Sequence, residues 1–173
     1  MIRNKAGTRR FGQVVDAKLV AMMTAIALAF LASCSGAPRY QGRPDATDSD
    51  RDGIVRFART FVGTPYRSGG TTYQGVDCSG FVFAVYREFD IRLPRTSLDQ
   101  SRIGQSIDRG DLEPADLVFF KTSKRASVTH VGIYVGGGKF IHASTSYRKV
   151  RVDALADDYY KKNFTVARRI VTR

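Results

Sequence analysis

Cys78, His130 and His142 carry the groups in this sequence that could break an amide bond. A cysteine thiolate attacks carbonyl carbons, and a histidine takes up and returns protons near neutral pH. A base of this kind needs a partner that fixes its tautomer. The sequence therefore predicts that Cys78 is a nucleophile, that His130 is its base, and that His142 holds the second ring nitrogen of His130.

Cys78 lies at the start of a predicted helix. The apolar residues that follow it have helical spacing: Phe81, Val82, Val85 and Phe89. Asp77 is a natural N-cap. In the first turn, free backbone N–H groups and the helix dipole favour the thiolate and can hold an oxyanion, for which the amides of Cys78 and Ser79 are candidates. A small buried core cysteine is the alternative interpretation of Cys78.

The two histidines lie on one predicted hairpin, in which residues 128–135 and 139–144 form strands around three consecutive glycines. If all three glycines form the turn, His142 lies opposite Gly132, and His130 is its diagonal neighbour on the same face. A two-residue turn would instead place the two histidines on opposite faces. Gly132 would leave space beside them for a substrate or a ring.

A zinc site is an alternative use of the same side chains, because Cys78, His130 and His142 could supply three ligands to an open site. No two of them have a local ligand spacing such as Cys-x-x-Cys or His-x-x-x-His, and a cysteine at a helix start needs no metal. We therefore expect no metal and no cofactor. Histidines that only pack or face solvent are a further alternative.

The first 33 residues have the pattern of a signal peptide. A basic start precedes an apolar run over residues 19–32, which is shorter than the roughly 20 residues of a membrane-spanning helix. Leu31-Ala32-Ser33-Cys34 resembles a bacterial lipobox, which implies that Cys34 receives lipid. The sequence therefore predicts a signal peptide over residues 1–33, a lipidated Cys34 with a flexible tether over residues 34–49, and a folded domain over residues 50–173.

Lipid on Cys34 would leave Cys78 without a disulfide partner in an oxidising compartment. Ser35 follows Cys34, which by analogy with other lipoproteins favours the outer membrane. We expect a monomer in the periplasm, held by lipid on Cys34 to the inner face of the outer membrane. The net charge is +12, but the basic residues form no dense stripe along the sequence, so we expect no nucleic-acid partner.

Three motifs resemble the NlpC-type (NlpC/p60) peptidases, a papain-like group of cell-wall cysteine peptidases. They are Asp77-Cys78-Ser79-Gly80-Phe81, Asp116-Leu117-Val118-Phe119-Phe120 and Thr129-His130-Val131-Gly132-Ile133-Tyr134. Two further segments, residues 93–97 and 140–146, look closer to the Spr/MepS branch of murein endopeptidase lipoproteins. The resemblance extends from Ile54 to Ile170.

The resemblance implies hydrolysis of amide bonds in the stem peptides of peptidoglycan. It favours D-alanyl–diaminopimelate cross-links as the target, with γ-D-glutamyl–diaminopimelate bonds as the alternative. A muramoyl-alanine amidase and an acyltransferase on the same fold are other enzyme classes. A non-catalytic wall-binding lipoprotein is an alternative of another kind.

The resemblance also assigns roles near Cys78. It maps an oxyanion- or substrate-binding tyrosine onto Tyr66, for which half-buried packing is the alternative. It implies that Asp77 and Ser79 contact substrate, whereas Asp77 could serve only as the helix cap. The family's usual Pro-Gly-Asp reads Pro114-Ala115-Asp116 here. If this turn needs a positive φ, Ala115 costs stability.

The order of the predicted elements, helices first and antiparallel strands later, indicates an α+β fold. The resemblance implies a papain-like (NlpC-type) fold, with N-terminal helices packed on a sheet of five or six antiparallel strands. We expect an amphipathic helix over residues 54–62, capped by Ser49 or Asp50, a loop over residues 69–75 and a short helix near residues 97–103. Strands are expected at residues 117–121, 128–135, 139–144, 149–153 and 165–171, with one or two helical turns over residues 154–160.

Overall fold

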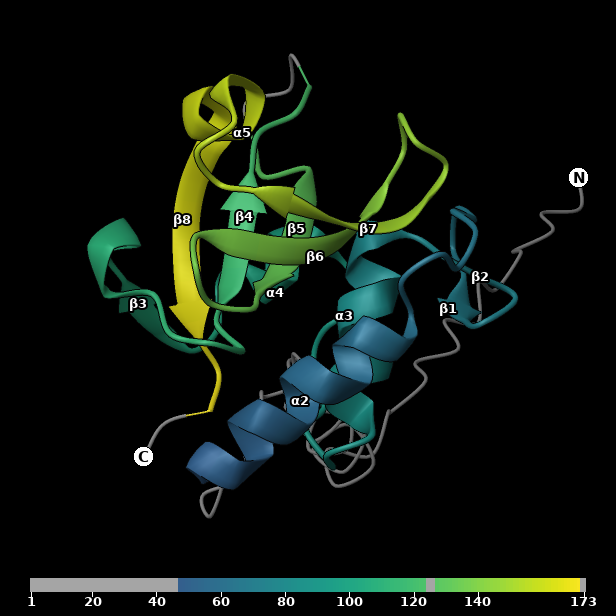
Figure 1. Cartoon of the computed structure of the whole chain (residues 1–173), viewed down its shortest axis with the longest axis horizontal. Helices are drawn as coiled ribbons and strands as arrows, with labels where there is room; N and C mark the ends of the chain where they lie inside the picture. Colours follow the sequence, from purple (N-terminus) through teal and green to yellow (C-terminus); the bar gives the residue numbers. More distant parts are fainter. Residues whose placement is uncertain (1–46, 124–126, 172–173) are drawn as a thin grey trace, which may run out of the picture. The chain divides into compact units, whose positions relative to one another are not determined.

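The computed structural model describes residues 47–123 and 127–171. The predicted signal peptide, Cys34 and most of the predicted tether therefore lie outside the described residues. Helices come first along the chain (Figure 1): α2 (Asp48–Thr60), α3 (Cys78–Arg87) and α4 (Ser97–Gln100). None of the helices in the described part of the chain is long and apolar enough to cross a membrane.

Six strands form one antiparallel sheet in the order β3-β8-β4-β5-β6-β7. The strands are β3 (Gln105–Ile107), β4 (Leu117–Phe120), β5 (His130–Tyr134), β6 (Lys139–Ser144), β7 (Lys149–Ala154) and β8 (Phe164–Arg169). A 3-10 turn over Arg109–Asp111 follows β3, and α5 (Asp158–Asn163) precedes β8. This architecture confirms the predicted α+β fold, with helices followed by an antiparallel sheet.

Three short strands are absent from the predicted set. Part of the loop predicted over residues 69–75 pairs as a small separate sheet, formed by β1 (Thr71–Thr72) and β2 (Gly75–Val76). β3 is also new, and it pairs with β8 at the edge of the main sheet. Runs of two or three residues are too short to show the alternating pattern by which strands are recognised in a sequence.

The predicted cap of the first helix is wrong. Thr47 is the N-cap of α2, not Ser49 or Asp50. The Asp50 carboxylate instead accepts a hydrogen bond from the Thr47 backbone N–H at 2.8 Å, as a residue in the third helical position does in a capping box. The helix therefore begins in a polar turn that precedes the apolar stripe from which the sequence predicts it.

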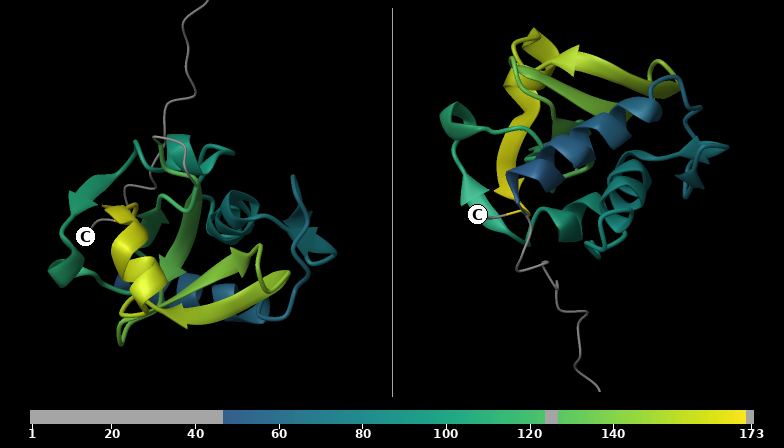
Figure 2. Two further views of the ribbon diagram at one scale, coloured as in Figure 1. Left: turned by 90° about the horizontal axis from the view of Figure 1, so that it is seen from above. Right: turned by 60° about the horizontal axis from the view of Figure 1, so that its bottom comes forward.

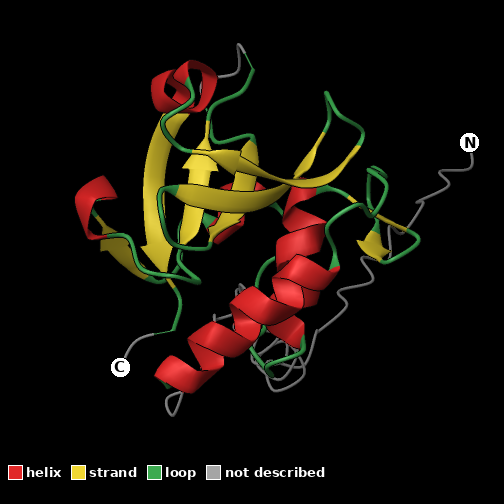
Figure 3. Cartoon of the chain, in the orientation of Figure 1, coloured by secondary structure: helices red, strands yellow, loops and turns green. Residues whose placement is uncertain are grey.

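The hydrophobic core lies on both faces of the main sheet. On one face, α2 and α3 lie beside each other over a cluster that includes Phe81, Val131 and Ile141 (Figures 2 and 3). On the other face, a second cluster includes Val118 and Phe140. All four residues of β4 are buried, because alternate side chains of this strand enter the two clusters. Burial on both faces explains why β4 is a continuous apolar run in the sequence.

The β5–β6 hairpin has the register that the sequence predicts. Tyr134 pairs with Phe140, and the Val135 N–H donates to the Lys139 carbonyl at 2.9 Å. The three glycines between them all have positive φ, a conformation that costs glycine little. The predicted three-residue turn is therefore confirmed.

Gly132 occupies the place beside His142 that this register requires. A Cβ atom at Gly132 would lie only 2.6 Å from Cδ2 of Phe140 and 3.1 Å from Cβ of His142. Of the two occupants predicted for the space beside Gly132, a substrate or a ring, the structure shows a ring, that of Phe140.

The turn before β4 contains the backbone strain that the sequence predicts. Ala115 has a φ of 70° and is buried. The next residue, Asp116, holds the turn in place, because its buried carboxylate accepts hydrogen bonds from Arg51 at 3.3 Å and from Arg169 at 3.0 and 2.9 Å. One carboxylate thus ties α2 and β8 to the start of β4.

We expect Ala115→Gly to stabilise the protein by about 1 kcal/mol, because glycine adopts a positive φ without the steric cost that the alanine Cβ carries. Urea denaturation measures the free energy of unfolding. Ala58→Gly is the matched control: Ala58 lies inside α2, where the same change should destabilise by about 1 kcal/mol. Lower stability of Ala115→Gly would show that the turn is not strained.

Candidate active site

Cys78 begins α3, as the sequence predicts, and Asp77 caps the helix. The Asp77 carboxylate accepts hydrogen bonds from the Gly80 N–H at 2.7 Å and from the Gly69 N–H at 2.8 Å. A Cβ atom at Gly80 would collide with the Gly70 carbonyl oxygen, so the close approach of loop and helix requires glycine here. The loop and the helix start are therefore held together around Asp77.

Arg95 completes the group around the helix start. Its guanidinium pairs with Asp77 at 2.6 Å and donates to the Ser79 hydroxyl at 3.0 Å. Burial opposes ionisation of Asp77, but hydrogen bonds from Arg95, Gly80 and Gly69 outweigh burial and hold the pKa of this carboxyl below its ordinary value. Asp77 is thus a charged helix cap, and Ser79, whose hydroxyl donates to it at 3.2 Å, belongs to the same network.

The Cys78 thiol is partly buried beside the first residues of β5. Burial raises the pKa of this thiol to about 11, and the charge of Asp77 acts in the same direction. Hydrogen bonds from the backbone N–H groups of Val131, Ser79 and Cys78 itself to the sulfur lower the pKa, but by less than burial raises it. The amides at the helix start therefore favour the thiolate, as the sequence predicts, but burial outweighs them, and the thiol of the free protein keeps its proton at neutral pH.

Tyr66 lies near the helix start. Burial, followed by the neighbouring Cys78 side chain and the charge of Asp77, raises the pKa of its hydroxyl. The Arg148 guanidinium lies 5.5 Å from the centre of the Tyr66 ring. Tyr66 is thus half-buried, and its protonated hydroxyl can donate a hydrogen bond near the nucleophile.

His130 and His142 contact each other, with 2.8 Å between Nε2 of His130 and Nδ1 of His142. Both rings are buried, at 7% and 1% exposure. Burial, followed by the neighbouring His142 ring, lowers the pKa of His130 to about 3, so His130 is neutral at neutral pH. Because Val131 donates to the Cys78 sulfur, His130 lies at the end of β5 that approaches the nucleophile.

The row of hydrogen bonds continues to Asp153, a site residue that the sequence does not predict. Oδ2 of Asp153 lies 2.9 Å from Nε2 of His142 and accepts from the Tyr160 hydroxyl at 2.9 Å. Arg151 pairs with the other carboxylate oxygen at 2.7 Å. Burial opposes ionisation of Asp153, but hydrogen bonds from His142 and Tyr160, together with the neighbouring Arg151 guanidinium, hold its pKa below the ordinary value.

The donor and the acceptor of each hydrogen bond in the row His130–His142–Asp153 follow from the chemistry of the three side chains. A carboxylate only accepts hydrogen bonds, so Nε2 of His142 carries the shared hydrogen. In a neutral His142 ring Nδ1 then accepts, and the donor is Nε2 of His130. This assignment leaves Nδ1 of His130 with a free lone pair, which a general base requires.

The predicted site residues within the described ranges gather in two neighbouring groups. One group surrounds the helix start and contains Tyr66, Asp77, Cys78 and Ser79; the other is the histidine pair. The lipidation predicted at Cys34 concerns a residue outside the described ranges and stays a prediction. Among the residues that the structure describes, no group of histidine, cysteine, aspartate or glutamate side chains is placed to hold a metal ion.

Known proteins are similar in sequence to this chain over most of the described domain. The model of the NlpC/P60 family matches residues 63–169. The chain is 46% identical over 143 residues to the probable endopeptidase NlpC of Escherichia coli (strain K12), covering 81% of this chain and 92% of that protein. It is 43% identical over 112 residues to the murein DD-endopeptidase MepS/murein LD-carboxypeptidase of the same strain, covering 64% of this chain and 58% of that protein.

The fold is shared with solved structures as well. The crystal structure of an NlpC/P60 family protein from Bacillus cereus ATCC 10987 matches with a TM-score of 0.67 at 36% sequence identity. The match covers 70% of this chain and 40% of that chain. Sequence, fold and the arrangement around Cys78 and His130 agree, and the chain belongs to the NlpC/P60 family.

Proposed function

We propose that this protein is a peptidoglycan hydrolase, a cysteine peptidase that cuts amide bonds in stem peptides. The observation that carries the proposal is the row His130–His142–Asp153, which ends beside the cysteine at the start of α3. The names of the relatives, a probable endopeptidase and a murein endopeptidase, support peptidoglycan as the substrate.

Cys78 attacks the carbonyl carbon of the scissile amide, and its proton passes to Nδ1 of His130 as the sulfur–carbon bond forms. His130 gives this proton to the amide nitrogen, the carbon–nitrogen bond breaks, and an amine leaves. Water then hydrolyses the thioester with His130 again as base, which releases a carboxylate and restores the thiol. The N–H groups of Cys78 and Ser79 and the Tyr66 hydroxyl are the donors available to the oxyanion.

His142 and Asp153 act as positioning residues for His130. Asp153 keeps the hydrogen of His142 on Nε2, and His142 therefore accepts from Nε2 of His130. The charge of Asp153 also opposes the effect of burial on the pKa of His130, so it stabilises the imidazolium that forms during attack.

The proposed scissile bond is the D-alanyl–diaminopimelate cross-link, because MepS is named a murein DD-endopeptidase. The γ-D-glutamyl–diaminopimelate bond is the second candidate. Hydrolysis of either bond releases the amine of a diaminopimelate residue.

The proposal includes a place in the cell. The lipobox pattern that ends at Cys34 supports export, removal of residues 1–33 and a lipid anchor. Ser35 supports the inner face of the outer membrane as the destination, within the periplasm. At that membrane a monomer could reach the stem peptides of the wall.

Purified muropeptides test the reaction. We expect the full-length chain to split a dimer with a D-alanyl–diaminopimelate cross-link into monomers, identified by mass. Cys78→Ala should cut on the order of 10⁴-fold more slowly, because it lacks the nucleophile. If the wild type cuts no amide in any muropeptide, the proposed function is wrong. Equal rates for Cys78→Ala would refute the assignment of the nucleophile, and release of whole stems from the sugar would identify an amidase.

Asp153→Asn tests the positioning row. An asparagine can turn its amide N–H₂ towards His142, which moves the hydrogen of His142 to Nδ1 and takes the lone pair of His130 away from the thiol. We expect kcat to fall on the order of 10²-fold with little change in KM. Nitrogen NMR of the imidazoles should show the tautomer change at His142, which a purely structural role would not produce.

Tyr160→Phe is the matched control for that variant. It removes one hydrogen bond to Asp153 but leaves the carboxylate and its bond to His142 in place. Its kcat should therefore fall by less than about tenfold, because the bond removed is charge-assisted but the carboxylate keeps its bonds to His142 and Arg151. An Asp153→Asn protein with wild-type kcat and an unchanged His142 tautomer would contradict the positioning role.

The protonation of Cys78 has a measurable consequence in the absence of substrate. Because burial raises the pKa of the thiol to about 11, the thiolate fraction is small at neutral pH and grows with pH. Alkylation of Cys78 by iodoacetamide should therefore accelerate by about tenfold per pH unit between pH 6 and pH 9. Cys78→Ala corrects for labelling at Cys34. A rate that is already constant from pH 6 upwards would show a preformed thiolate–imidazolium pair instead.

A further inference from the structure

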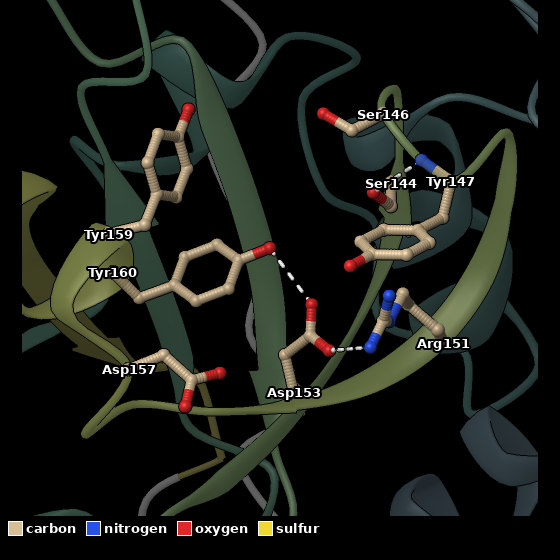
Figure 4. A pocket seen from close by; sticks show the side chains of 8 residues that line it. All are labelled: Ser144, Ser146, Tyr147, Arg151, Asp153, Asp157, Tyr159 and Tyr160. Atoms are coloured by element: carbon tan, nitrogen blue, oxygen red, sulfur yellow. Dashed lines mark hydrogen bonds and ion pairs between the residues drawn. The ribbon is translucent and has the colours of Figure 1, made fainter.

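The turn between β6 and β7 makes two contacts between an arginine and an aromatic ring. In the first, the Arg151 guanidinium lies 3.6 Å from the centre of the Tyr147 ring (Figure 4). The Tyr147 N–H also donates to the Ser144 hydroxyl at 3.2 Å, which closes the turn on itself. In the second contact, the Arg148 guanidinium lies over the ring of Tyr66, 5.5 Å from its centre. The turn therefore reaches a side chain of the group around the start of α3.

The backbone around Tyr66 is held from two sides. On one side, the Tyr66 N–H donates to the carbonyl of Arg148 in the β6–β7 turn at 2.8 Å. On the other side, the Val76 N–H of β2 donates to the Pro65 carbonyl at 3.0 Å, and the Val76 carbonyl accepts from the Arg67 N–H at 2.9 Å. Because α3 begins almost directly after β2, the turn, Tyr66 and the nucleophile belong to one hydrogen-bonded arrangement.

Arg148 holds this place at a cost in backbone energy. Its φ is 58°, in the left-handed region that glycine enters without a steric penalty and that the Cβ of an arginine opposes. Its side chain is exposed, and within the described ranges no carboxylate forms an ion pair with the guanidinium. Folding alone would therefore favour glycine at this position, and the contact that the arginine adds is the one with the Tyr66 ring. Residues in such strained conformations are found preferentially at functional sites.

The charge of Arg148 acts on the hydroxyl of Tyr66. Burial, the Cys78 side chain and the charge of Asp77 raise the pKa of this hydroxyl, whereas the charge of Arg148 lowers it. A more acidic hydroxyl is a stronger hydrogen-bond donor. The oxyanion gains its charge only during attack, so a stronger donor stabilises the transition state more than it stabilises the bound substrate.

We propose that Arg148 is a positioning residue for Tyr66: its guanidinium packs on the face of the Tyr66 ring and strengthens the hydroxyl as a donor to the oxyanion. The inference rests on the proposed function and on the role of Tyr66 within it. Arg148 acts through Tyr66 and not on the reacting atoms. A cation over an aromatic ring at a partly exposed site stabilises modestly, so its removal should slow the reaction several-fold and not abolish it.

Two replacements separate the charge of Arg148 from its backbone conformation. Arg148→Lys keeps a cation and Arg148→Gln removes it, and both keep a Cβ atom at the positive φ. With the full-length protein and a muropeptide that the wild type cuts, Arg148→Gln should lower kcat about fivefold with little change in KM. Arg148→Lys should recover most of this loss. A rise in KM at unchanged kcat would show that Arg148 binds substrate directly and would overturn the proposal.

Arg148→Gly separates the effect on the reaction from the effect on folding. Urea denaturation should show a higher free energy of unfolding than in the wild type, because glycine relieves the strain at the positive φ. The kcat should nevertheless fall as it does in Arg148→Gln. A fall in both quantities would mean that the arginine merely supports the turn, which contradicts the positioning role.

The titration of Tyr66 gives a readout that needs no substrate. Carbon NMR of tyrosine labelled at Cζ follows the ionisation of each hydroxyl, and Tyr66→Phe assigns the signal. Arg148→Gln should raise the pKa of the Tyr66 hydroxyl, and Arg148→Lys should leave it near that of the wild type. In the Tyr66→Phe protein, which keeps the ring but lacks the hydroxyl, Arg148→Gln should have no further effect on kcat. Effects that simply add would refute action through the hydroxyl.

Arg87→Gln is the matched control. The Arg87 guanidinium lies 5.4 Å from the centre of the Phe83 ring, at the end of α3 opposite to Cys78, so this variant loses a similar contact away from the site. It should keep the wild-type kcat and the wild-type titration of Tyr66. If Arg148→Gln keeps the wild-type kcat in an active hydrolase, the positioning role is refuted and the hydrolase stands. If the wild type cuts no muropeptide, the hydrolase is refuted. An unchanged titration of Tyr66 in Arg148→Gln refutes this inference whether or not the wild type is active.

Discussion

The site depends on the register of three neighbouring strands, β5, β6 and β7. In this register His142 lies opposite Gly132 on one side and opposite Arg151 on the other. His130 and Asp153 are then the diagonal neighbours of His142 on the same face, which is where their hydrogen bonds to it form. A slip of one residue in either pairing would turn one end of the row to the opposite face. The three-glycine turn, which fixes the β5–β6 register, therefore has a direct part in the chemistry.

Burial of the row decides which charges the resting site can hold. His142 is 1% exposed and stacks on Phe140, with ring centres 4.9 Å apart. A charge in such a place is costly unless it has a partner, and Arg151 supplies one to Asp153. Cys78 and His130 have no comparable partner, so both rest neutral. The proton then moves when the substrate arrives and its oxyanion can share the charge with the first-turn amides.

The sequence predicts those parts of the site that follow from local pattern. The helix start at Cys78 follows from the Asp77 cap and the apolar spacing behind it, and the histidine pair follows from the glycine turn. Asp153 could not be found in this way, since nothing next to it in the sequence marks it. Its role arises from the β6–β7 pairing, a contact between strands whose register the sequence does not state.

The thiol of Cys78 shows a second limit of local pattern. Helix dipole and free amides can be inferred from a sequence, and both favour the thiolate. Burial favours the protonated thiol, and its effect on the pKa is larger. The extent of burial depends on how the loop, the helix and β5 pack around the sulfur. The same limit applies to α2, whose cap at Thr47 precedes the apolar stripe. Tertiary structure thus changed the electrostatic prediction while it left the identity of the nucleophile as it was.

One carboxylate connects a partly exposed cation to the proposed base. Asp153 gives one oxygen to His142 and Tyr160 and the other to Arg151. Because Asp153 is buried, it keeps its charge through these hydrogen bonds and through the nearby Arg151 guanidinium. The charge that Asp153 keeps opposes the effect of burial on the pKa of His130. The imidazolium that forms at His130 during attack is therefore stabilised, through His142, by a carboxylate that Arg151 helps to keep ionised.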